Sequence, residues 1–296
     1  KASDLFVRCL ENEGITHIFG VPGEENADFM MSLEGSSIEF VLTRHEQGAA
    51  VMAGAYGRLT GNPAGCLATL GPGAANLVTG VADANMDHGP VLALTGQGGT
   101  FRQHKESHQV MDVVGMFRPI TKWAHQVIDA DAIPEVVRKA VRISRAEKMG
   151  AVLIELPEDI AKHDTDSAPV EVHRFRRPSP DQRAVPQALQ LLKTAKRPIV
   201  ISGNGAIRKR ASHAVRRFAE ATGIGVASTF MVKGAVDMDD PRCLFTIGLQ
   251  GKDHVHCAVA ASDLVLCVGY DVVEYPPWLR NAAGDNKILH IDYEEA

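Results

Sequence analysis

Short apolar runs recur along the first half of the chain, and they alternate with segments that are long enough to form helices. The runs lie at residues 15–21, 38–43, 65–70, 90–96, 120–127 and 151–157. The intervening segments include "EQGAAVMAGAYGRLT" at 46–60 and "NLVTGVADANM" at 76–86. Continuous apolar strands that alternate with helices are typical of parallel sheets covered by helices on both faces. The pattern therefore predicts an α/β domain over residues 1–165.

The alternation stops over residues 163–187, "HDTDSAPVEVHRFRRPSPDQRAVPQ", which hold four prolines and many charged residues. This composition is typical of a linker, which we place at residues 166–187. Apolar runs resume at 197–205, 223–229, 263–270 and 287–293, so they predict a second α/β domain over residues 188–296. The predicted fold is two successive α/β domains, each with a largely parallel sheet flanked by helices. Because the chain stops three residues after its last run, we expect the second domain to be truncated.

The composition argues against several classes of protein. The 296 residues are 45% hydrophobic and carry a net charge of −5, whereas a nucleic-acid-binding domain is expected to present a basic face. No apolar run reaches the ~18 residues that a membrane-spanning helix needs. The five cysteines lie far apart and include no C-x-x-C pair, which argues against a disulfide framework. We therefore expect a reducing, cytoplasmic location.

Glu46 stands where a predicted strand ends and a predicted helix begins. Ligands of open parallel sheets bind beyond the carboxyl ends of the strands. A helix N-terminus favours the carboxylate, whereas burial favours the protonated acid, which can serve as a proton donor near neutral pH. The alternative is a solvent-exposed residue in the first turn. Burial is favoured by the small residues that follow, which are Gly48, Ala49, Ala50, Ala53, Gly54 and Ala55.

Three other patterns point weakly to ligands. Gly-Pro-Gly at 71–73, with a helix expected to start near Ala74, could cradle a phosphate, but a simple strand-to-helix turn is the stronger interpretation. His104 and His108 are four residues apart, yet no third metal ligand accompanies them. We instead predict a polar loop that lines a cleft. The stretch 202–211 follows a strand but has Arg208 where a dinucleotide loop has its third glycine, which argues against NAD.

Five stretches together resemble the pyruvate-type thiamine diphosphate enzymes, and within them the large subunits of acetolactate synthases. They are "FGVPGEEN" (19–26), "TRHEQGAAVMAGAYGRLTG" (43–61), "ATLGPGAANLVTGVADANMD" (68–87), "PVLALTGQ" (90–97) and "SHQVMDVVGMFRPITKWA" (107–124). The resemblance extends over essentially the whole chain, and the run from 43 to 87 is its most specific part. It implies a pyrimidine-binding first domain and a Rossmann-like middle domain.

The resemblance gives Glu46 a role. In this family a first-domain glutamate hydrogen-bonds N1′ of the cofactor's aminopyrimidine and drives an imino tautomer, whose 4′ nitrogen removes the C2 proton of the thiazolium. The carbanion attacks the 2-oxo carbon of pyruvate, and the cofactor then serves as electron sink for decarboxylation. The implied reaction joins two pyruvates to 2-acetolactate and releases CO₂. The same motifs also fit a 2-oxoacid decarboxylase, a pyruvate oxidase or a sulfoacetaldehyde acetyltransferase.

Further site residues follow from the same resemblance. The implied cofactor contacts besides Glu46 are Val21, Pro22, Gly23, Thr69, Pro72 and Asn76. Gln109 matches a catalytic glutamine near the substrate and its covalent adduct. Glu24 and Glu25 depart from the small residues of the FAD-containing synthases, which affects the acceptor side of the pocket.

The resemblance also implies parts that this chain lacks. The family holds the diphosphate and Mg²⁺ in a C-terminal domain with a G-D-G…N motif, which is absent here, so this chain alone is expected to be inactive. Residues 269–278 read "GYDVVEYPPW" instead of the R-F-D-D-R-like sequence of FAD-containing relatives, so we expect no FAD. The family builds its site between subunits, which implies a homodimer or tetramer. A nucleotide-binding or structural α/β module remains the alternative of another class.

Overall fold

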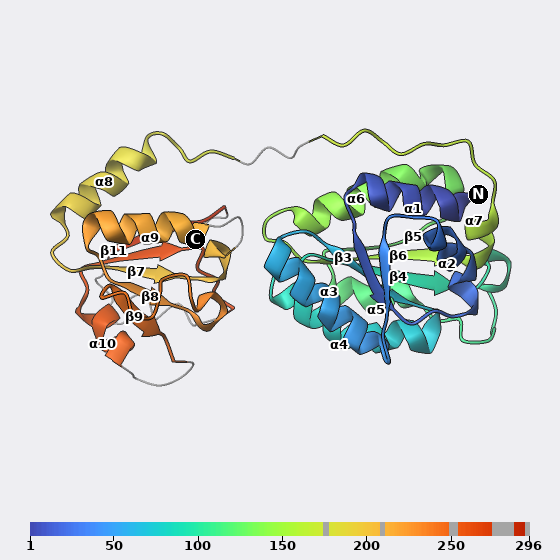
Figure 1. Ribbon diagram of the computed structural model, residues 1–296, viewed down its shortest axis with the longest axis horizontal. Helices are drawn as coiled ribbons and strands as arrows, with labels where there is room; N and C mark the ends of the chain where they lie inside the picture. The colour runs from blue at the N-terminus through green and yellow to red at the C-terminus, as the bar shows by residue number, and fades with distance from the viewer. Residues whose placement is uncertain (174–177, 208–210, 249–253, 274–286, 294–296) are drawn as a thin grey trace. The chain divides into compact units, whose positions relative to one another are not determined.

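The computed structural model describes residues 1–173, 178–207, 211–248, 254–273 and 287–293. The chain forms two compact units, residues 1–175 and 176–296 (Figure 1). Each unit contains one sheet in which the neighbouring strands run parallel, with helices packed against it. The predicted fold class is confirmed. Among the described residues, no helix is both long enough and apolar enough to cross a lipid bilayer.

The first unit contains a six-stranded parallel sheet in the order β2-β1-β3-β4-β6-β5. The strands are β1 (His17–Gly20), β2 (Glu39–Leu42), β3 (Ala64–Ala68), β4 (Val91–Gln97), β5 (Trp123–Gln126) and β6 (Ala151–Pro157). Every residue of β3, β4 and β6 is buried, which explains their unbroken apolar sequences. The edge strands β2 and β5 have no buried residue, so their ends were harder to locate from sequence.

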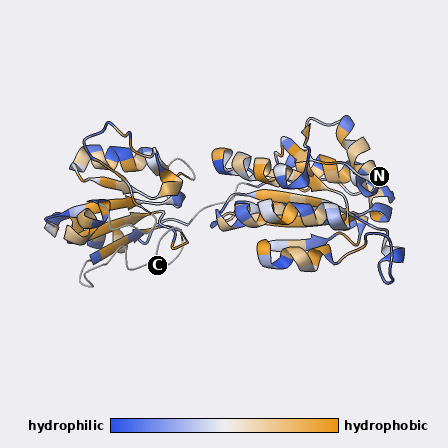
Figure 2. Cartoon of the chain, turned by 90° about the horizontal axis from the view of Figure 1, so that it is seen from below, coloured by the Kyte–Doolittle hydropathy of each residue, from blue (hydrophilic) through white to orange (hydrophobic). Residues whose placement is uncertain are grey.

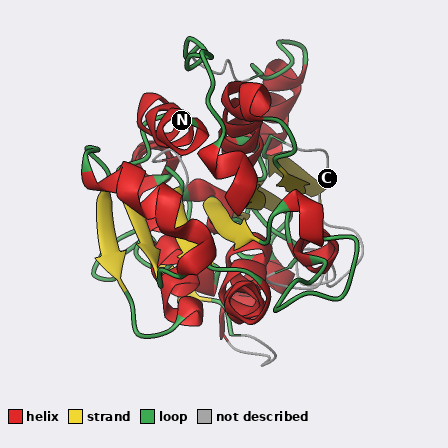
Figure 3. Ribbon diagram, turned by 90° about the vertical axis from the view of Figure 1, so that its right-hand side faces the viewer, coloured by secondary structure: helices red, strands yellow, loops and turns green. Residues whose placement is uncertain are grey.

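Helices cover both faces of this sheet, as Figures 1 and 3 show. One face carries α1 (Ala2–Asn12), α2 (Ala27–Glu34), α6 (Ile133–Arg145) and α7 (Glu158–Lys162). The other face carries α3 (Glu46–Thr60), α4 (Gly71–Met86) and α5 (Val113–Phe117). Hydrophobic residues gather on the strands and on the helix faces turned toward them (Figure 2).

The two faces of the sheet differ in the size of their side chains. Leucine, isoleucine, valine and phenylalanine fill most of the face under α1, α2 and α6. Under α3 and α4, nine of the sixteen buried core residues are alanine, counted within the described part of the chain. Small side chains let two helices approach each other closely, so α3 and α4 have little freedom to shift.

The second unit contains a five-stranded parallel sheet in the order β11-β10-β7-β8-β9. Its strands are β7 (Pro198–Ser202), β8 (Val226–Ser228), β9 (Cys243–Thr246), β10 (Leu264–Val268) and β11 (Lys287–Ile291). Helices α8 (Ala184–Thr194) and α9 (Ala211–Thr222) pack on one face, and α10 (His254–Ala261) packs on the other. Helix α8 begins at Ala184, inside the stretch 166–187 that was predicted as a linker.

Short 3-10 helices complete the described structure. They are η1 (Glu24–Asn26), η2 (Thr100–Arg102), η3 (Arg118–Ile120), η4 (Ala130–Ala132), η5 (Asn204–Ala206) and η7 (Phe230–Val232). The predicted turn at 71–73 is wrong, because Gly71 already belongs to α4 and Pro72 occupies its first turn. Proline suits that position because the first turn needs no N–H donor from it.

Candidate active site

The carboxyl ends of three neighbouring strands bring most of the predicted site residues together. Strand β1 ends at Gly20 and leads into Val21–Gly23, β2 leads to Glu46, and β3 leads to Thr69 and the start of α4. Because β2, β1 and β3 are adjacent and parallel, these segments meet at one edge of the sheet. The location agrees with the general position of ligand sites in open α/β sheets.

Glu46 is the first residue of α3, and Asn76 of α4 orients its side chain. The Asn76 side-chain amide Nδ2 donates a hydrogen bond of 3.0 Å to Glu46 Oε2. His45 caps the helix, because its Nδ1 accepts from the backbone N–H of Gln47 at 3.1 Å. The positive end of the α3 dipole favours a carboxylate at this position. In the described structure, Glu46 Oε1 has no hydrogen-bond partner of its own, so it can accept from a ligand.

The predicted burial of Glu46 by the small residues that follow it does not occur within the described chain. Glu46 is partly exposed, and the small residues of α3 pack against α4 instead. A Cβ atom added to Gly80 would lie 2.6 Å from the Cβ of Ala50, and one added to Gly54 would lie 3.2 Å from the Cβ of Ala84. The small residues therefore set the separation of the two helices, and with it the geometry of the bond between Glu46 and Asn76.

Residues 21–23 cross the end of β3 in direct contact with Thr69. A Cβ on Gly23 would lie 2.6 Å from the Cβ of Thr69, so only glycine fits there without a shift. Val21 N donates to Leu67 O at 3.2 Å. The Thr69 hydroxyl donates to Glu25 Oε2 at 2.8 Å, which makes Glu25 a site residue that sequence reasoning had treated only as a departure from the family. Pro22 is exposed beside this contact.

Gln109 approaches the same edge from the loop between β4 and α5. Its backbone has a φ of 56°, and its carbonyl oxygen lies where a Cβ on Gly71 would be. Gly71 itself has a φ of 47°, a conformation that glycine adopts without strain. The Gln109 side chain is exposed. The structure thus places the backbone of Gln109 over Gly71 in the first turn of α4. Gly71 is two residues before Gly73, the glycine that lies beside Glu46 Oε1.

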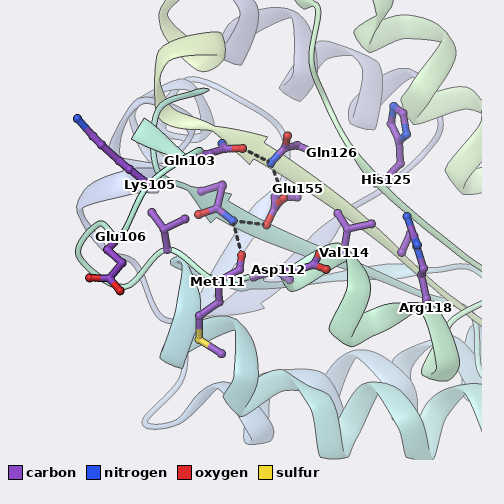
Figure 4. A pocket seen from close by; sticks show the side chains of 14 residues that line it. Gln103, Lys105, Glu106, Met111, Asp112, Val114, Arg118, His125, Gln126 and Glu155 are labelled. Carbon is purple, nitrogen blue, oxygen red and sulfur yellow. Dashed lines mark hydrogen bonds between the residues drawn. The ribbon is translucent and has the colours of Figure 1, made fainter. Parts of the chain in front are cut away.

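A polar pocket of about 680 Å³ lies under the same loop, next to the carboxyl ends of β4, β5 and β6 (Figure 4). Glu155 stands in this pocket with only 1% of its surface exposed. Burial raises the pKa of Glu155 to about 7, although hydrogen bonds from Gln126 and Gln97 oppose the shift. Sequence reasoning missed Glu155, although an acidic residue inside the apolar run "AVLIELP" was a readable signal.

Two weaker candidates receive no support from the geometry. His104 and His108 lie in an irregular loop, and no group of three metal-ligating side chains occurs in the described part of the chain. In the loop after β7, the backbone N–H groups of Gly203 and Gly205 donate to Val268 O and Gly269 O at 2.9 and 2.8 Å. They are occupied within the protein and do not point at a phosphate. Arg208 lies outside the described residues.

Gly73 has no side chain to cover the Glu46 carboxylate. A Cβ on Gly73 would lie 2.9 Å from Thr69 Cγ2 and 3.4 Å from Glu46 Oε1, so any larger residue would fill the space beside the carboxylate. A carboxylate oxygen that has no other hydrogen bond can share a proton with the ring nitrogen of an aminopyrimidine. The residues at this edge therefore fit the pyrimidine end of thiamine diphosphate.

Two models of known protein families match this chain. Residues 1–116 match the thiamine pyrophosphate enzyme N-terminal TPP binding domain, and residues 185–296 match the thiamine pyrophosphate enzyme central domain. The chain belongs to the thiamine pyrophosphate enzyme family.

Its similar relatives are acetolactate synthases. The chain is 36% identical over 295 residues to the acetolactate synthase of Bacillus subtilis (strain 168), which covers 99% of this chain and 52% of that protein. It is 36% identical over 300 residues to the catabolic acetolactate synthase of Raoultella terrigena, with 99% and 53% covered. It is 38% identical over 305 residues to acetolactate synthase 2, chloroplastic, of Nicotiana tabacum, with 100% and 46% covered. The chain spans about half the length of these relatives.

Proposed function

We propose that the protein containing this chain is a thiamine diphosphate-dependent acetolactate synthase, which condenses two pyruvates to 2-acetolactate and releases CO₂. The observation that carries the proposal is Glu46 at the head of α3, with Oε2 held by Asn76 and Oε1 open beside Gly73. The relatives at 36–38% identity support the choice of reaction within the family.

The chain's own residues would act on the pyrimidine end of the cofactor. Bound thiamine diphosphate supplies a carbanion and an electron sink for decarboxylation of a 2-oxoacid. Glu46 would hold a proton at Oε1 next to a ring nitrogen, and Asn76 would keep the carboxylate oriented for that exchange. Val21, Pro22, Gly23, Thr69 and Pro72 would line the cofactor, and Gln109 would face the substrate.

We propose that Mg²⁺ and the diphosphate bind to a part of the protein outside the matched N-terminal and central domains. FAD is not required in this proposal. The expectation rests on residues 269–278, of which 274–278 lie outside the described residues. The cytoplasm is the proposed compartment.

We further propose self-association as a homodimer or tetramer through the first unit. Large apolar side chains are exposed on α3 and α4, where Val51 is 49%, Leu59 87% and Met86 63% exposed. Such side chains on neighbouring helices favour burial against another surface. A strictly monomeric sedimentation profile of the full-length protein would contradict this part of the proposal.

The test of the reaction uses the full-length protein with pyruvate, thiamine diphosphate and Mg²⁺, without FAD, and identifies the product by NMR. Acetolactate is expected. Acetaldehyde or acetyl phosphate would instead indicate a sister enzyme that uses the same cofactor. Glu46→Gln is expected to lower turnover by about 100-fold to 10,000-fold, because it removes the proton exchange. Glu34→Gln, at the exposed end of α2, is the matched control and should leave turnover unchanged. Near-wild-type turnover of Glu46→Gln would refute the assignment.

A further inference from the structure

The loop from Gly98 to Asp112 carries Gln109, and its shape depends on polar contacts. Apart from the short helix η2, it has no regular secondary structure. Its outer side is anchored at α7, where Arg102 pairs with Glu158 at 2.9 Å and the Thr100 backbone N–H donates to Asp159 at 3.0 Å. Its inner side faces the carboxyl ends of β4, β5 and β6, where Gln97, Gln126 and Glu155 lie.

Glu155 stands at the centre of the inner contacts. Gln97 Nε2 donates to Glu155 Oε1 at 2.9 Å, and Gln126 Nε2 donates to Glu155 Oε2 at 2.7 Å. The same two amide nitrogens donate to the loop, at Met111 O (3.0 Å) and at Gln103 Oε1 (3.1 Å). Figure 4 shows Glu155, Gln126 and Gln103 turned toward one another. Each glutamine therefore uses one N–H on the carboxylate and one on the loop.

Two more bonds extend the network to the beginning of the loop. Gln97 Oε1 accepts from the backbone N–H of Gly98 at 2.9 Å, and Gln103 Nε2 donates to Gly98 O at 2.6 Å. The loop is thus tied at Gly98, Gln103 and Met111. All these contacts require both glutamines to present N–H groups to Glu155, an arrangement that only a group with two acceptor oxygens satisfies.

The side chains described around Glu155 include no close counter-ion. Within the described part of the chain, no cationic side chain forms an ion pair with it. The titratable groups that line the pocket with it are Lys105, Glu106, Asp112, Arg118 and His125. Asp112 raises the pKa of Glu155 further, and Figure 4 shows Lys105 and Glu106 pointing away from the carboxyl. A buried carboxyl held only by amides costs stability, which is typical of a group retained for a functional reason.

We propose that Glu155 is a positioning residue that fixes Gln97 and Gln126 as donors and thereby holds the 98–112 loop, with Gln109, against Gly71 at the start of α4. The consequence for catalysis rests on the proposed function, in which Gln109 faces the substrate. The consequence for the loop does not rest on it. Protonation of Glu155 places a hydroxyl donor opposite an amide donor, so the loop is held best by the ionised form.

Glu155→Gln is the sharpest perturbation because it preserves size and removes one acceptor. The NH₂ group of the new glutamine side chain faces the side-chain N–H of Gln97. If Gln97 flips its amide to accept from this group, its own NH₂ then faces the backbone N–H of Gly98. Either arrangement leaves two donors facing each other, and the flipped one places this repulsive contact at the start of the loop. Glu106→Gln is the matched control, since Glu106 is exposed on the rim of the same pocket.

The first experiment measures amide hydrogen exchange by mass spectrometry at pH 8 in the full-length protein. Glu155→Gln is expected to speed exchange of the peptides that cover 98–112 by about tenfold, with the β3 and β4 peptides unchanged. Glu106→Gln should match the wild type. Unchanged protection of the loop in Glu155→Gln, or an equal loss in every peptide of the first unit, would overturn the proposal.

A second variant decides the matter if Glu155→Gln does not fold. Gln103→Ala removes the loop's side of the network from a partly exposed position and leaves the carboxyl with both of its amide donors. It should also loosen the 98–112 peptides selectively. Wild-type protection of these peptides in Gln103→Ala would then overturn the proposal.

The second readout is the pH dependence of pyruvate turnover in the full-length protein. The wild type should lose kcat/KM as the pH falls through about 7, whereas Glu155→Gln should show about tenfold lower kcat/KM with no titration in that range. A retained acid limb in Glu155→Gln would overturn the role of Glu155 in placing Gln109. If the wild type does not turn over pyruvate, the proposed function fails, but the exchange experiment still tests the network.

Discussion

Replacing Gly80 by alanine tests the idea that small residues fix the position of α3 relative to α4. A Cβ at this position would lie 2.6 Å from the Cβ of Ala50, 3.0 Å from the backbone N of Val51 and 3.1 Å from the carbonyl O of Gln47. All three atoms belong to the backbone or are fixed to it, so no side chain can rotate away. The two helices must separate or bend to admit one methyl group.

A matched substitution isolates the free-energy cost of crowding at Gly80. Overpacking of a close-packed core costs about 1–3 kcal/mol, whereas alanine in place of glycine inside a helix gains up to ~1 kcal/mol. Gly48→Ala, in α3, brings the same gain, but no atom lies within 4 Å of its new Cβ. The difference between the two variants therefore isolates the crowding, at roughly 1–3 kcal/mol.

The assay is thermal unfolding followed by the fluorescence of Trp123 in β5, in a Trp278→Phe background that removes the second tryptophan. For a unit of this size, the two variants should differ in Tm by about 2–12 °C, with Gly48→Ala the more stable. Equal Tm values would refute the reasoning, because they would show that α3 and α4 are not in contact at Gly80.

Two further predictions concern Glu155 and Gly71. The carboxyl of Glu155 ionises near 4.5 when unfolded and near 7 when folded, so its contribution to stability is complete below pH 4.5 and is lost as the pH rises through 7. We therefore expect the unfolding free energy of wild type, measured in urea, to fall relative to that of Glu155→Gln by up to ~3 kcal/mol between pH 4.5 and 8. A difference between the two proteins that stays constant with pH would contradict this. Gly71→Ala, at a φ of 47° and in collision with Gln109 O, should cost about 2 kcal/mol or more of unfolding free energy. Gly35→Ala, with a φ of −94° and open space around it, is the control, and equal stability of the two would be the contrary result.

The sheet of the first unit was predictable because its central strands are buried on both faces. The apolar runs 65–70 and 90–96 overlap β3 and β4 with a shift of one or two residues at the ends, and the run 151–157 coincides with β6. The edge strand predicted at 120–127 is shorter, Trp123–Gln126, because Ile120 closes η3 and Thr121 bonds back to Phe117. The domain limits predicted at 165 and 188 stay predictions, since the two compact units alone do not define them.

The location of Glu46 followed from the strand-end rule, but its surroundings did not. Asn76 is thirty residues away in the sequence, and its bond to Glu46 exists only because α3 and α4 pack through small residues. The same small residues were interpreted as a cover for the carboxylate, since a sequence shows which residues are small but not which element they face. The roles of the site residues in catalysis stay proposals.

Two carboxyl groups at the same edge of one sheet have different uses because their oxygens are occupied differently. Glu46 is partly exposed, takes one amide bond and keeps Oε1 open, so it can exchange a proton with a ligand. Glu155 is buried and takes amide bonds at both oxygens, so it can only act on the chain that surrounds it. The surroundings of each carboxyl group, and not its residue type, therefore decide whether it can act on a ligand or only on the protein. In the proposed mechanism, a reaction at Glu46 would therefore depend on Glu155 indirectly, because the loop tied to Glu155 passes over the first turn of the helix that supplies Asn76.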